Sequence, residues 1–377
     1  MKQILPKTYQ GFLLIALLTT AFSCQKSMND PDGSNSGRAN GNNFSQELKN
    51  FVQVNLVGDN GLHDPAFIDP GLINPWGIAF SNSGPAMVST ERTGTARSFT
   101  LDGNPDGTIF SIPLRAGSSD AGHPTGVVFN PTSNFILPNG NPAKFIFASV
   151  NGTVSGWNLG SSAICKIEGP PGRAYMGVAL ANDGSDFFLY TANFAQNRID
   201  VFDKNWKQVN NKLFVDPALP AGYSPFNIQI ISDGKLYVMY AKKDANGKRE
   251  IGPGNGYINI FSPNGTLLKR FASKGKLNAP WGITMAPAGF WGEFGQTQLS
   301  NIILVGNNGD GHINAFDENG NFIGPLHTKG KAIEIEGLWG ITYPPITGLN
   351  RYYLYFASGP GNETHGLIGY IKNAFLN

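Results

Sequence analysis

The chain has 377 residues, with 48 Gly, 25 Pro and 12% aromatic residues, and only 14% of its residues are charged. Its formal charge of +2 falls to zero when Lys2 and Lys7 are set aside, and no basic run remains to follow a phosphate backbone. This composition argues against a nucleic-acid partner and favours an all-β protein with many turns.

Residues 1–23 predict an export signal of the lipoprotein type. The basic start at Lys2 and Lys7 precedes "GFLLIALLTTAF", an apolar run too short to span a membrane comfortably. The following "AFSC" resembles a bacterial lipobox, although Ala replaces the usual Leu three residues before the cysteine. We expect cleavage before Cys24 and acylation of Cys24. The alternative is ordinary secretory cleavage, after which Cys24 could pair with Cys165.

Residues 24–50 predict a flexible tether, and residues 51–377 the folded body. The segment "QKSMNDPDGSNSGRANGNN" is rich in Ser, Asn, Gly and Asp and has almost nothing to bury. Together with the signal, it predicts an exported lipoprotein of the cell envelope. We expect it in the outer membrane, facing the periplasm or the surface, with the lipid as its sole contact with the membrane.

An internal repeat organises the body. One short motif occurs six times, at spacings of 49, 51, 50, 55 and 58 residues. The six copies are "PWGIAF" at Pro75, "PTGVVF" at Pro124, "YMGVAL" at Tyr175, "PFNIQI" at Pro225, "PWGITM" at Pro280 and "LWGITY" at Leu338. A second apolar run follows each copy. A third run carries one aromatic residue, namely Phe99, Trp157, Phe202, Phe261, Phe316 and Tyr370.

A fourth run completes five of the six units. Examples are "TIFSIPL", "KLFVDP" (residues 212–217) and "LLKRFAS", and Gly- or Asn-bearing turns typical of tight hairpins separate the runs. The sixth unit lacks a fourth run. The alternating "FVQVNLV" at residues 51–57 precedes the first unit and can supply it. Such a closure hides sheet edges that an open stack would expose.

The pattern predicts an all-β, six-bladed β-propeller with four antiparallel strands per blade, closed by strand 51–57 in the last blade. A solenoid is the rival architecture, but the borrowed strand disfavours it. The repeated motif would form the innermost strand of each blade. Its Gly, present in five of six copies, would remove a side chain where the backbones converge.

The loops that precede the inner strands and the hairpins that follow the second strands should emerge on one face. We expect Trp76, Trp281, Trp339, His123 and Asn227 to line this channel mouth and to bind a ligand, a glycan or a protein partner. The alternative is structural, with the tryptophans packed between blades and the amides capping turns.

A divalent cation is a second interpretation of the same face. Glu91, Asn193, Asn307 and Glu336 could offer oxygen ligands to Ca²⁺ in the channel from different blades. Turn chemistry explains the same Asn and Gly residues, and no spacing requires a metal.

Signatures of common enzymes are missing from the sequence. It contains no G-x-S-x-G, H-E-x-x-H or G-x-x-x-x-G-K-[ST] motif, and its five histidines occur singly. We therefore favour a non-catalytic binding propeller. The alternative is a metal-dependent hydrolase, lactonase or lyase that uses the central channel, and a purely structural role is a third.

Several long phrases resemble an uncharacterised family of exported bacterial propeller-like proteins, some of which end in a PEP-CTERM-type sorting tag. These phrases are "DPGLINPWGIAF", "LPAGYSPFNIQ", "GPGNGYINIFS", "LNAPWGITMAPAGF", "GDGHINAFD" and "EGLWGITY". The chain lacks the tag. More remotely, the arrangement is similar to NHL-type and gluconolactonase-like (SMP-30-type) propellers. The latter hold a divalent metal through a Glu near the first inner strand, where this chain has Trp76. The resemblance implies the fold and export, and it carries over no catalytic residue.

Overall fold

The computed structural model describes residues 48–82, 84–292, 299 and 301–376. The predicted signal at residues 1–23, Cys24 and most of the predicted tether therefore lie outside the described residues. In the described part, no helix is both long and apolar enough to span a membrane.

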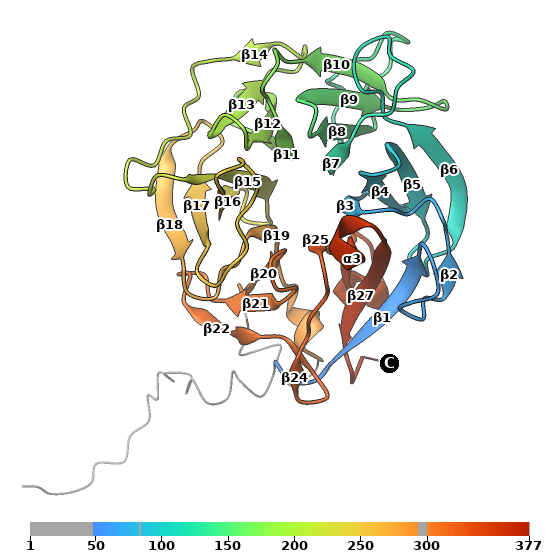
Figure 1. Cartoon of the computed structure of the whole chain (residues 1–377), viewed down its shortest axis with the longest axis vertical. Helices are drawn as coiled ribbons and strands as arrows, with labels where there is room; N and C mark the ends of the chain where they lie inside the picture. Colours follow the sequence, from blue (N-terminus) through green and yellow to red (C-terminus); the bar gives the residue numbers. More distant parts are fainter. Residues whose placement is uncertain (1–47, 83, 293–298, 300, 377) are drawn as a thin grey trace, which may run out of the picture. The chain divides into compact units, whose positions relative to one another are not determined.

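Six sheets stand around a central axis, as Figure 1 shows, which confirms the predicted six-bladed β-propeller. Blade 1 consists of β3 (Pro75–Phe80), β4 (Ala86–Thr90), β5 (Thr95–Phe99) and β6 (Pro105–Ser111). Blade 2 consists of β7 (Pro124–Phe129), β8 (Phe145–Ser149), β9 (Thr153–Trp157) and β10 (Ile164–Glu168). Blade 3 consists of β11 (Tyr175–Asn182), β12 (Phe187–Asn193), β13 (Arg198–Phe202) and β14 (Gln208–Val209). All six copies of the repeated motif form the innermost strands.

The remaining blades follow the same order. Blade 4 consists of β15 (Tyr223–Ile230), β16 (Leu236–Lys242), β17 (Gly256–Phe261) and β18 (Leu267–Ser273). Blade 5 consists of β19 (Pro280–Met285), β20 (Ile303–Asn307), β21 (Ile313–Phe316) and β22 (Phe322–Pro325). Blade 6 consists of β25 (Leu338–Thr342), β26 (Leu354–Ser358), β27 (Leu367–Asn373) and β1 (Phe51–Gly58). β2 (Phe67–Ile68) pairs parallel with β1 and adds a fifth, outer strand to the last blade. The connections hold the remaining short elements: β23 (His327–Thr328), β24 (Lys331–Ala332), η1 (Ala288–Trp291), η2 (Leu349–Tyr352) and α3 (Pro360–Glu363).

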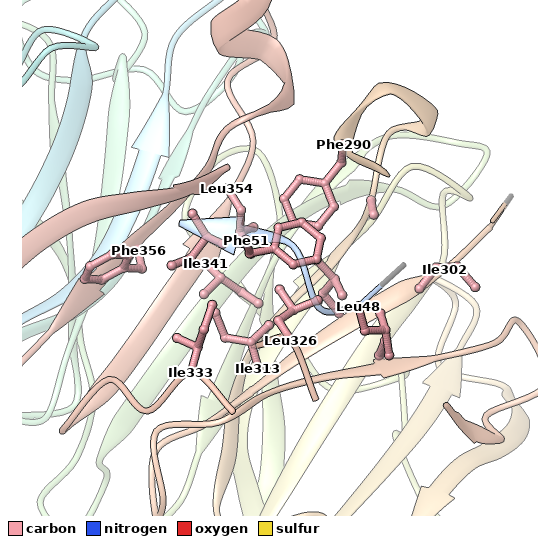
Figure 2. Packing of buried hydrophobic residues seen from close by; sticks show 14 of the residues in the cluster. Leu48, Phe51, Phe290, Ile302, Ile313, Leu326, Ile333, Ile341, Leu354 and Phe356 are labelled. Atoms are coloured by element: carbon pink, nitrogen blue, oxygen red, sulfur yellow. The ribbon is translucent and has the colours of Figure 1, made fainter. Parts of the chain in front are cut away.

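The closing strand lies where the sequence predicts it. β1 pairs antiparallel with β27 from Phe51↔Asn373 to Gly58↔Leu367, so the start of the body completes the last blade. Phe51 also stacks on Phe290 of η1 in blade 5, with ring centroids 4.7 Å apart. Figure 2 shows this cluster, in which Leu48 is buried as well. The folded body therefore extends at least to Leu48, three residues earlier than the sequence predicts.

One predicted strand is wrong. "KLFVDP" (residues 212–217) forms no strand, and the fourth strand of blade 3 is the short β14, which pairs Val209 with Val201. A tight turn with Trp206 at φ 67° returns the chain onto β13 before that segment begins. Phe214 then packs against Tyr190 and Phe261, which covers the junction between blades 3 and 4.

Glycines of the inner strands let neighbouring blades approach to backbone contact. A Cβ on each would lie 2.8 Å or less from an atom of the next blade: Gly77 from Thr125, Gly126 from Val178, Gly177 from Asn227, Gly282 from Trp339 and Gly340 from Trp76. Blade 4 has Asn227 instead, and its amide donates to the Trp281 carbonyl at 2.8 Å. Close contacts between neighbouring inner strands, which we call the interlock, therefore run round the whole ring. The sequence predicts such contacts from the recurring Gly.

Candidate functional site

Three indoles meet at the centre of the ring. Trp76 of β3 and Trp339 of β25 stack with ring centroids 3.5 Å apart, and Trp281 of β19 lies edge-on to both, at 6.2 and 5.8 Å. Phe226 and Phe194 extend the same buried cluster. We call Trp76, Trp281 and Trp339 the indole plug. The structure brings these three predicted residues together, largely buried against one another.

The three strands that carry the plug share one backbone feature. The residue two positions before each tryptophan has a left-handed conformation: Asn74 (φ 49°), Ala279 (φ 46°) and Gly337 (φ 64°). In each case its carbonyl accepts the first backbone N–H of the hairpin after the second strand, at 2.9–3.1 Å. The other three blades have no positive φ at this position. Trp therefore recurs in the blades whose inner strand is preceded by a left-handed residue. That backbone conformation is strained at Asn74 and Ala279, which are not glycine.

A pocket of about 600 Å³ opens on one side of the plug. Its floor and apolar wall are formed by Trp76, Val150, Ala174, Met176, Phe194, Ala195, Phe226 and Ile251. Its polar rim includes Glu91, Arg92, Lys248, Arg249, Asn362 and Glu363. We call this the channel-mouth pocket. It lies on the face predicted from the hairpins, and it combines an aromatic floor with charged side chains.

Glu91 is the hub of the rim on the side of blades 1 and 2. Its Oε2 accepts from Asn74 Nδ2 at 2.9 Å, and Arg92 Nε lies 3.4 Å from the same oxygen. Its Oε1 lies 2.8 Å from Nδ1 of His123, whose side chain is nearly half exposed. Asn74 in turn accepts from Trp339 Nε1 at 3.1 Å. A continuous polar chain therefore links the exposed His123 to the buried plug.

An ion pair bridges two long hairpins over the plug. Arg249 lies in the 13-residue connection 243–255 between β16 and β17, and Glu363 lies in the eight-residue connection 359–366 between β26 and β27. Their side chains form an ion pair, and the Arg249 guanidinium lies 5.0 Å from the Trp339 ring centroid. Blade 5 separates these blades in the ring, so the pair spans the mouth of the channel.

Lys243 adds a further cation beside the pocket. Its Nζ donates to the Ala195 carbonyl at 3.1 Å and to Asn197 Oδ1 at 2.6 Å, and lies 5.3 Å from the Phe194 ring centroid. Burial lowers the pKa of Lys243 from its ordinary value, because desolvation disfavours the ammonium ion.

Asn227 lies on the other side of the plug from the charged rim. With Trp281 and Gln229 it lines a small cavity of about 80 Å³ between the inner strands. Its amide donates to Gln229 Oε1 at 3.2 Å as well as to the Trp281 carbonyl. Of the predicted ligand-binding residues, Trp76 lines the channel-mouth pocket and His123 contacts its rim through Glu91, whereas Asn227 and Trp281 line this inner cavity.

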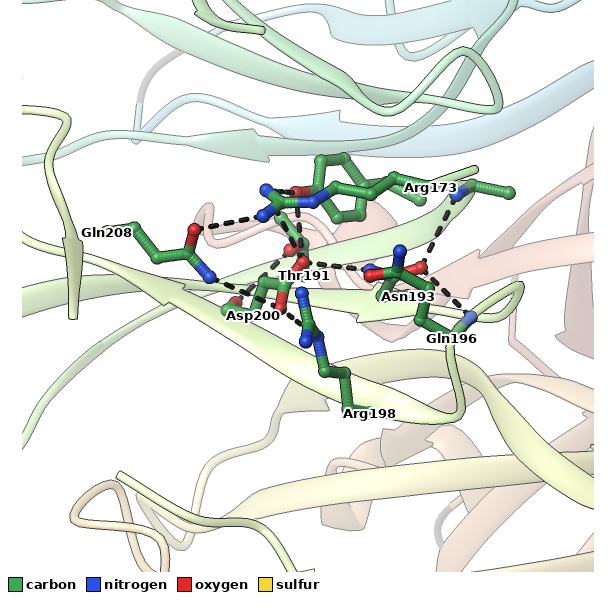
Figure 3. A network of polar contacts seen from close by, with 9 residues as sticks. Arg173, Thr191, Asn193, Gln196, Arg198, Asp200 and Gln208 are labelled. Carbon is green, nitrogen blue, oxygen red and sulfur yellow. Dashed lines mark hydrogen bonds and ion pairs between the residues drawn. The ribbon is translucent and has the colours of Figure 1, made fainter. Parts of the chain in front are cut away.

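The side chain of Asn193, a predicted metal ligand, forms hydrogen bonds within its own blade. Its Nδ2 donates to Asp200 Oδ2 at 2.8 Å, and its Oδ1 accepts backbone N–H groups of Ala174 and Gln196. Figure 3 shows this network, in which buried Asp200 also accepts from Arg198 Nε at 2.6 Å. The nearby Tyr175 phenol donates to Asp200 at 3.0 Å, and burial raises its pKa. These contacts brace blade 3.

Asn307 and Glu336 are bonded elsewhere. Asn307 Nδ2 donates to the Lys276 carbonyl at 2.7 Å, and its Oδ1 accepts from the Asn278 backbone. The exposed Glu336 accepts from the Gly361 backbone at 3.0 Å. Within the described ranges, no three His, Cys, Asp or Glu side chains form a metal-binding group. Glu91, Asn193, Asn307 and Glu336 each form hydrogen bonds with protein groups, and the metal site that they could form stays a prediction.

Several pocket residues escaped the sequence analysis, above all Lys248, Arg249 and Glu363. The signal that could have found them is loop length. The connections between second and third strands have three to five residues in blades 1, 2, 3 and 5, but 13 in blade 4 and eight in blade 6. Loops that exceed the repeat are common carriers of binding residues.

No protein-family model matches the chain. It is 37% identical over 336 residues to "Uncharacterized protein R648" of Acanthamoeba polyphaga mimivirus, covering 85% of this chain and 80% of that protein. It is 36% identical over 334 residues to "Uncharacterized protein L690" of the same virus, covering 84% of each. These relatives are viral, so the bacterial origin and sorting tag of the resembled family find no support here.

Solved structures confirm the fold alone. A streptogramin B lyase superposes with a TM-score of 0.51 at 14% identity, over 86% of this chain and 98% of that chain. A catalytically inactive virginiamycin B lyase from Staphylococcus aureus, solved with quinupristin, gives 0.50 at 13% identity over 85% and 98%. At such identities the likeness says nothing about activity.

Proposed function

Because this chain belongs to the family of the mimivirus proteins R648 and L690, themselves uncharacterised, we propose its function from the geometry of the channel-mouth pocket. The protein is an exported propeller, anchored to the cell envelope through Cys24, that binds a small ligand or a short glycan in this pocket without a catalytic step. A concave site of about 600 Å³ suits such ligands better than the flat face of a protein partner.

The observation that carries this proposal is the composition of the pocket. The largely buried Trp76 and Phe226 form its floor, and they are held by the plug and by the interlocked inner strands. Val150, Met176 and Ile251 present apolar surface above that floor. A rigid aromatic base with a few placed charges can bind without rearranging the fold.

Filling the pocket tests the proposal. Ala195→Trp adds a large side chain at an exposed lining position and should abolish ligand capture without lowering the melting temperature. Ala116→Trp, at an exposed position outside the pocket, is the matched control. Small molecules retained from a cell extract by each full-length variant would be identified by native mass spectrometry. Equal retention by both variants would contradict the proposal.

The anchor requires a separate test, supported by the sequence of residues 1–24 alone. Cys24→Ser should move the protein from the membrane fraction to the soluble exported fraction, and the mass of its N-terminal peptide should lose the acyl groups. A Cys24→Ser protein that stays in the membrane fraction would overturn lipid anchoring while leaving ligand binding intact.

The Glu91–His123 pair supports a second candidate function, in which a bound ligand is cleaved by hydrolysis or by a lyase-type elimination. The Nδ1–Oε1 contact of 2.8 Å can orient the imidazole so that Nε2 is available as a base or acid. In the metal-dependent form of this function, Glu91, Asn193, Asn307 and Glu336 would exchange their present hydrogen bonds with protein groups for bonds to the metal ion. His123→Ala should abolish turnover but retain binding; a pocket ligand recovered unchanged after incubation with the wild-type protein would argue against catalysis.

A further inference from the structure

Two N–H donors on residues that line the channel-mouth pocket have no acceptor among the described residues. They are Nε1 of Trp76 and Nε of Arg249, both buried. The other two plug indoles are satisfied, because Trp281 donates to the Met176 carbonyl and Trp339 to Asn74, each at 3.1 Å. Buried donors normally find acceptors, because an unpaired donor loses its hydrogen bonds to water without replacement. Both atoms are closed to solvent, but the Arg249 side chain as a whole is 23% exposed, so other atoms of that side chain can meet a ligand.

The guanidinium of Arg249 has capacity for a second acidic group. Arginine presents five N–H donors, and one of its terminal nitrogens pairs with Glu363. The cation also lies over the Trp339 face, which holds it at the pocket. Arg97 and Arg173 also leave a buried Nε unpaired, but neither lines this pocket.

The charges of the lining favour an anion. Three cations, Arg92, Lys248 and Arg249, face two carboxylates, Glu91 and Glu363, so the pocket carries one excess positive charge. Both carboxylates already have partners, Glu91 in Arg92, Asn74 and His123, and Glu363 in Arg249. Lys248 lines the pocket and occurs in no ion pair among the described residues, and Lys243 adds positive charge nearby.

From these contacts we propose that the pocket recognises a carboxylate-bearing ligand, with its carboxylate on the partly exposed Arg249 guanidinium and its apolar part against Val150, Met176 and Ile251. This inference rests on the proposed binding function and adds the ligand class. A carboxylate matches the geometry of the guanidinium donors, and one charge balances the excess of the lining.

Glu363 lowers the affinity of the pocket for a carboxylate in this arrangement. It lies in a run of three left-handed residues, Gly361, Asn362 and Glu363, that brings its carboxylate to Arg249. Because it is an internal carboxylate on the same guanidinium, it competes electrostatically with a bound one. Glu363→Gln should therefore strengthen carboxylate binding several-fold, an effect that general destabilisation cannot produce.

The experiment uses a matched pair of probes, 4-phenylbutanoate and 4-phenylbutanamide, which differ in charge but hardly in shape. The full-length protein is labelled with ¹⁵N at its six tryptophans, and the indole N–H signals are followed during each titration. Trp76→Phe assigns the Trp76 signal. Trp291 supplies an internal control, because its Nε1 also lacks an acceptor but lies in the closed core beside Phe290.

We expect the carboxylate to shift the Trp76 signal at millimolar concentration, the amide to leave it in place, and neither probe to move Trp291. Arg249→Gln should weaken carboxylate binding by about 10- to 100-fold, as expected for a charged hydrogen bond of about 1.5–3 kcal/mol. Arg115→Gln, at an exposed position away from the pocket, should change nothing. Melting temperatures verify that the variants fold.

Equal shifts from both probes, no shift from either, or unchanged affinity in Arg249→Gln would each overturn the carboxylate proposal. None of these results decides the proposed function, which is tested by retention of extract molecules in Ala195→Trp and Ala116→Trp. If extract ligands are retained by the wild type and prove uncharged, binding stands and carboxylate recognition fails.

Discussion

At the scale of single residues, the inner-strand glycines control how closely the blades approach. The sequence predicts this role because Gly recurs at one position of the repeat. The sequence does not predict whether the indoles of Trp76, Trp281 and Trp339 pack against one another or face a ligand, because the same repeat is compatible with both arrangements. The choice depends on left-handed residues such as Ala279, whose type gives no hint of positive φ.

Replacing one of these glycines should destabilise the ring. In Gly340→Ala the new Cβ would lie 2.8 Å from the Trp76 carbonyl, so two inner strands must separate. We expect a loss of about 1–3 kcal/mol in the free energy of unfolding, measured by chemical denaturation. Gly61→Ala is the control, because its Cβ would meet nothing within 4 Å and its φ is not positive. Equal stabilities of the two variants would refute the interlock.

The thiol of Cys165 should react slowly in the folded protein. Burial, aided by the Glu168 carboxylate, raises its pKa from 9.0 to about 11. Alkylation by iodoacetamide at pH 8 should therefore be about 100-fold slower than in the urea-unfolded chain, measured by mass spectrometry of the peptide that contains Cys165. Because the folded-state pKa is raised, this residue stabilises the fold below pH 9, and the contribution is lost as the pH rises towards 11. Rapid native alkylation would contradict the burial.

At the scale of elements, the blades follow from the repeat, and the exceptions have local causes. Strand 51–57 could be predicted because it alternates and has no partner nearby in sequence. The fourth strand of blade 3 could not, because "KLFVDP" has the apolar pattern of a strand but uses Phe214 to cover a blade junction. The ion pair of Arg249 and Glu363 joins two loops 114 positions apart, and no periodicity relates them.

The closing strand offers a prediction with a control on the same element. Val57 is fully buried in β1, whereas Val52 is 38% exposed. Val57→Asp should cost several kcal/mol by placing a carboxylate in the core of the last blade, and should open the ring between β1 and β27. Val52→Asp should leave the free energy of unfolding, measured by guanidinium denaturation, within about 0.5 kcal/mol of the wild type. Similar losses in both variants would show that β1 does not close the ring as described.

At the scale of the whole molecule, the plug ties distant blades together. Its tryptophans come from blades 1, 5 and 6, and their cluster includes Phe194 of the β12–β13 connection and Phe226 of blade 4. The centre of the ring therefore cannot loosen without disturbing most blades, unlike an open solenoid in which repeats contact only their neighbours.

Unfolding of the body should accordingly occur in one transition. Far-ultraviolet circular dichroism reports the strands. Tryptophan fluorescence reports the plug once Trp157, Trp206 and Trp291, which lie outside it, are replaced by Phe, and the two denaturation curves should coincide. A fluorescence change at lower denaturant concentration than the loss of strand signal would mean that the plug opens before the blades, and would contradict this coupling.

The backbone contacts at Gly77, Gly126, Gly177, Gly282 and Gly340 have a consequence for protein engineering and for divergence. They set the bore of the ring without help from the side chains of the long hairpins. Hairpin 243–255 and the tip of hairpin 359–366 can therefore be exchanged or lengthened while the frame is retained, provided that Gly359 and His365 keep their backbone bonds to Gly337 and Asn74. On such a frame, new ligand specificities can evolve or be designed by changing the sequences of two loops.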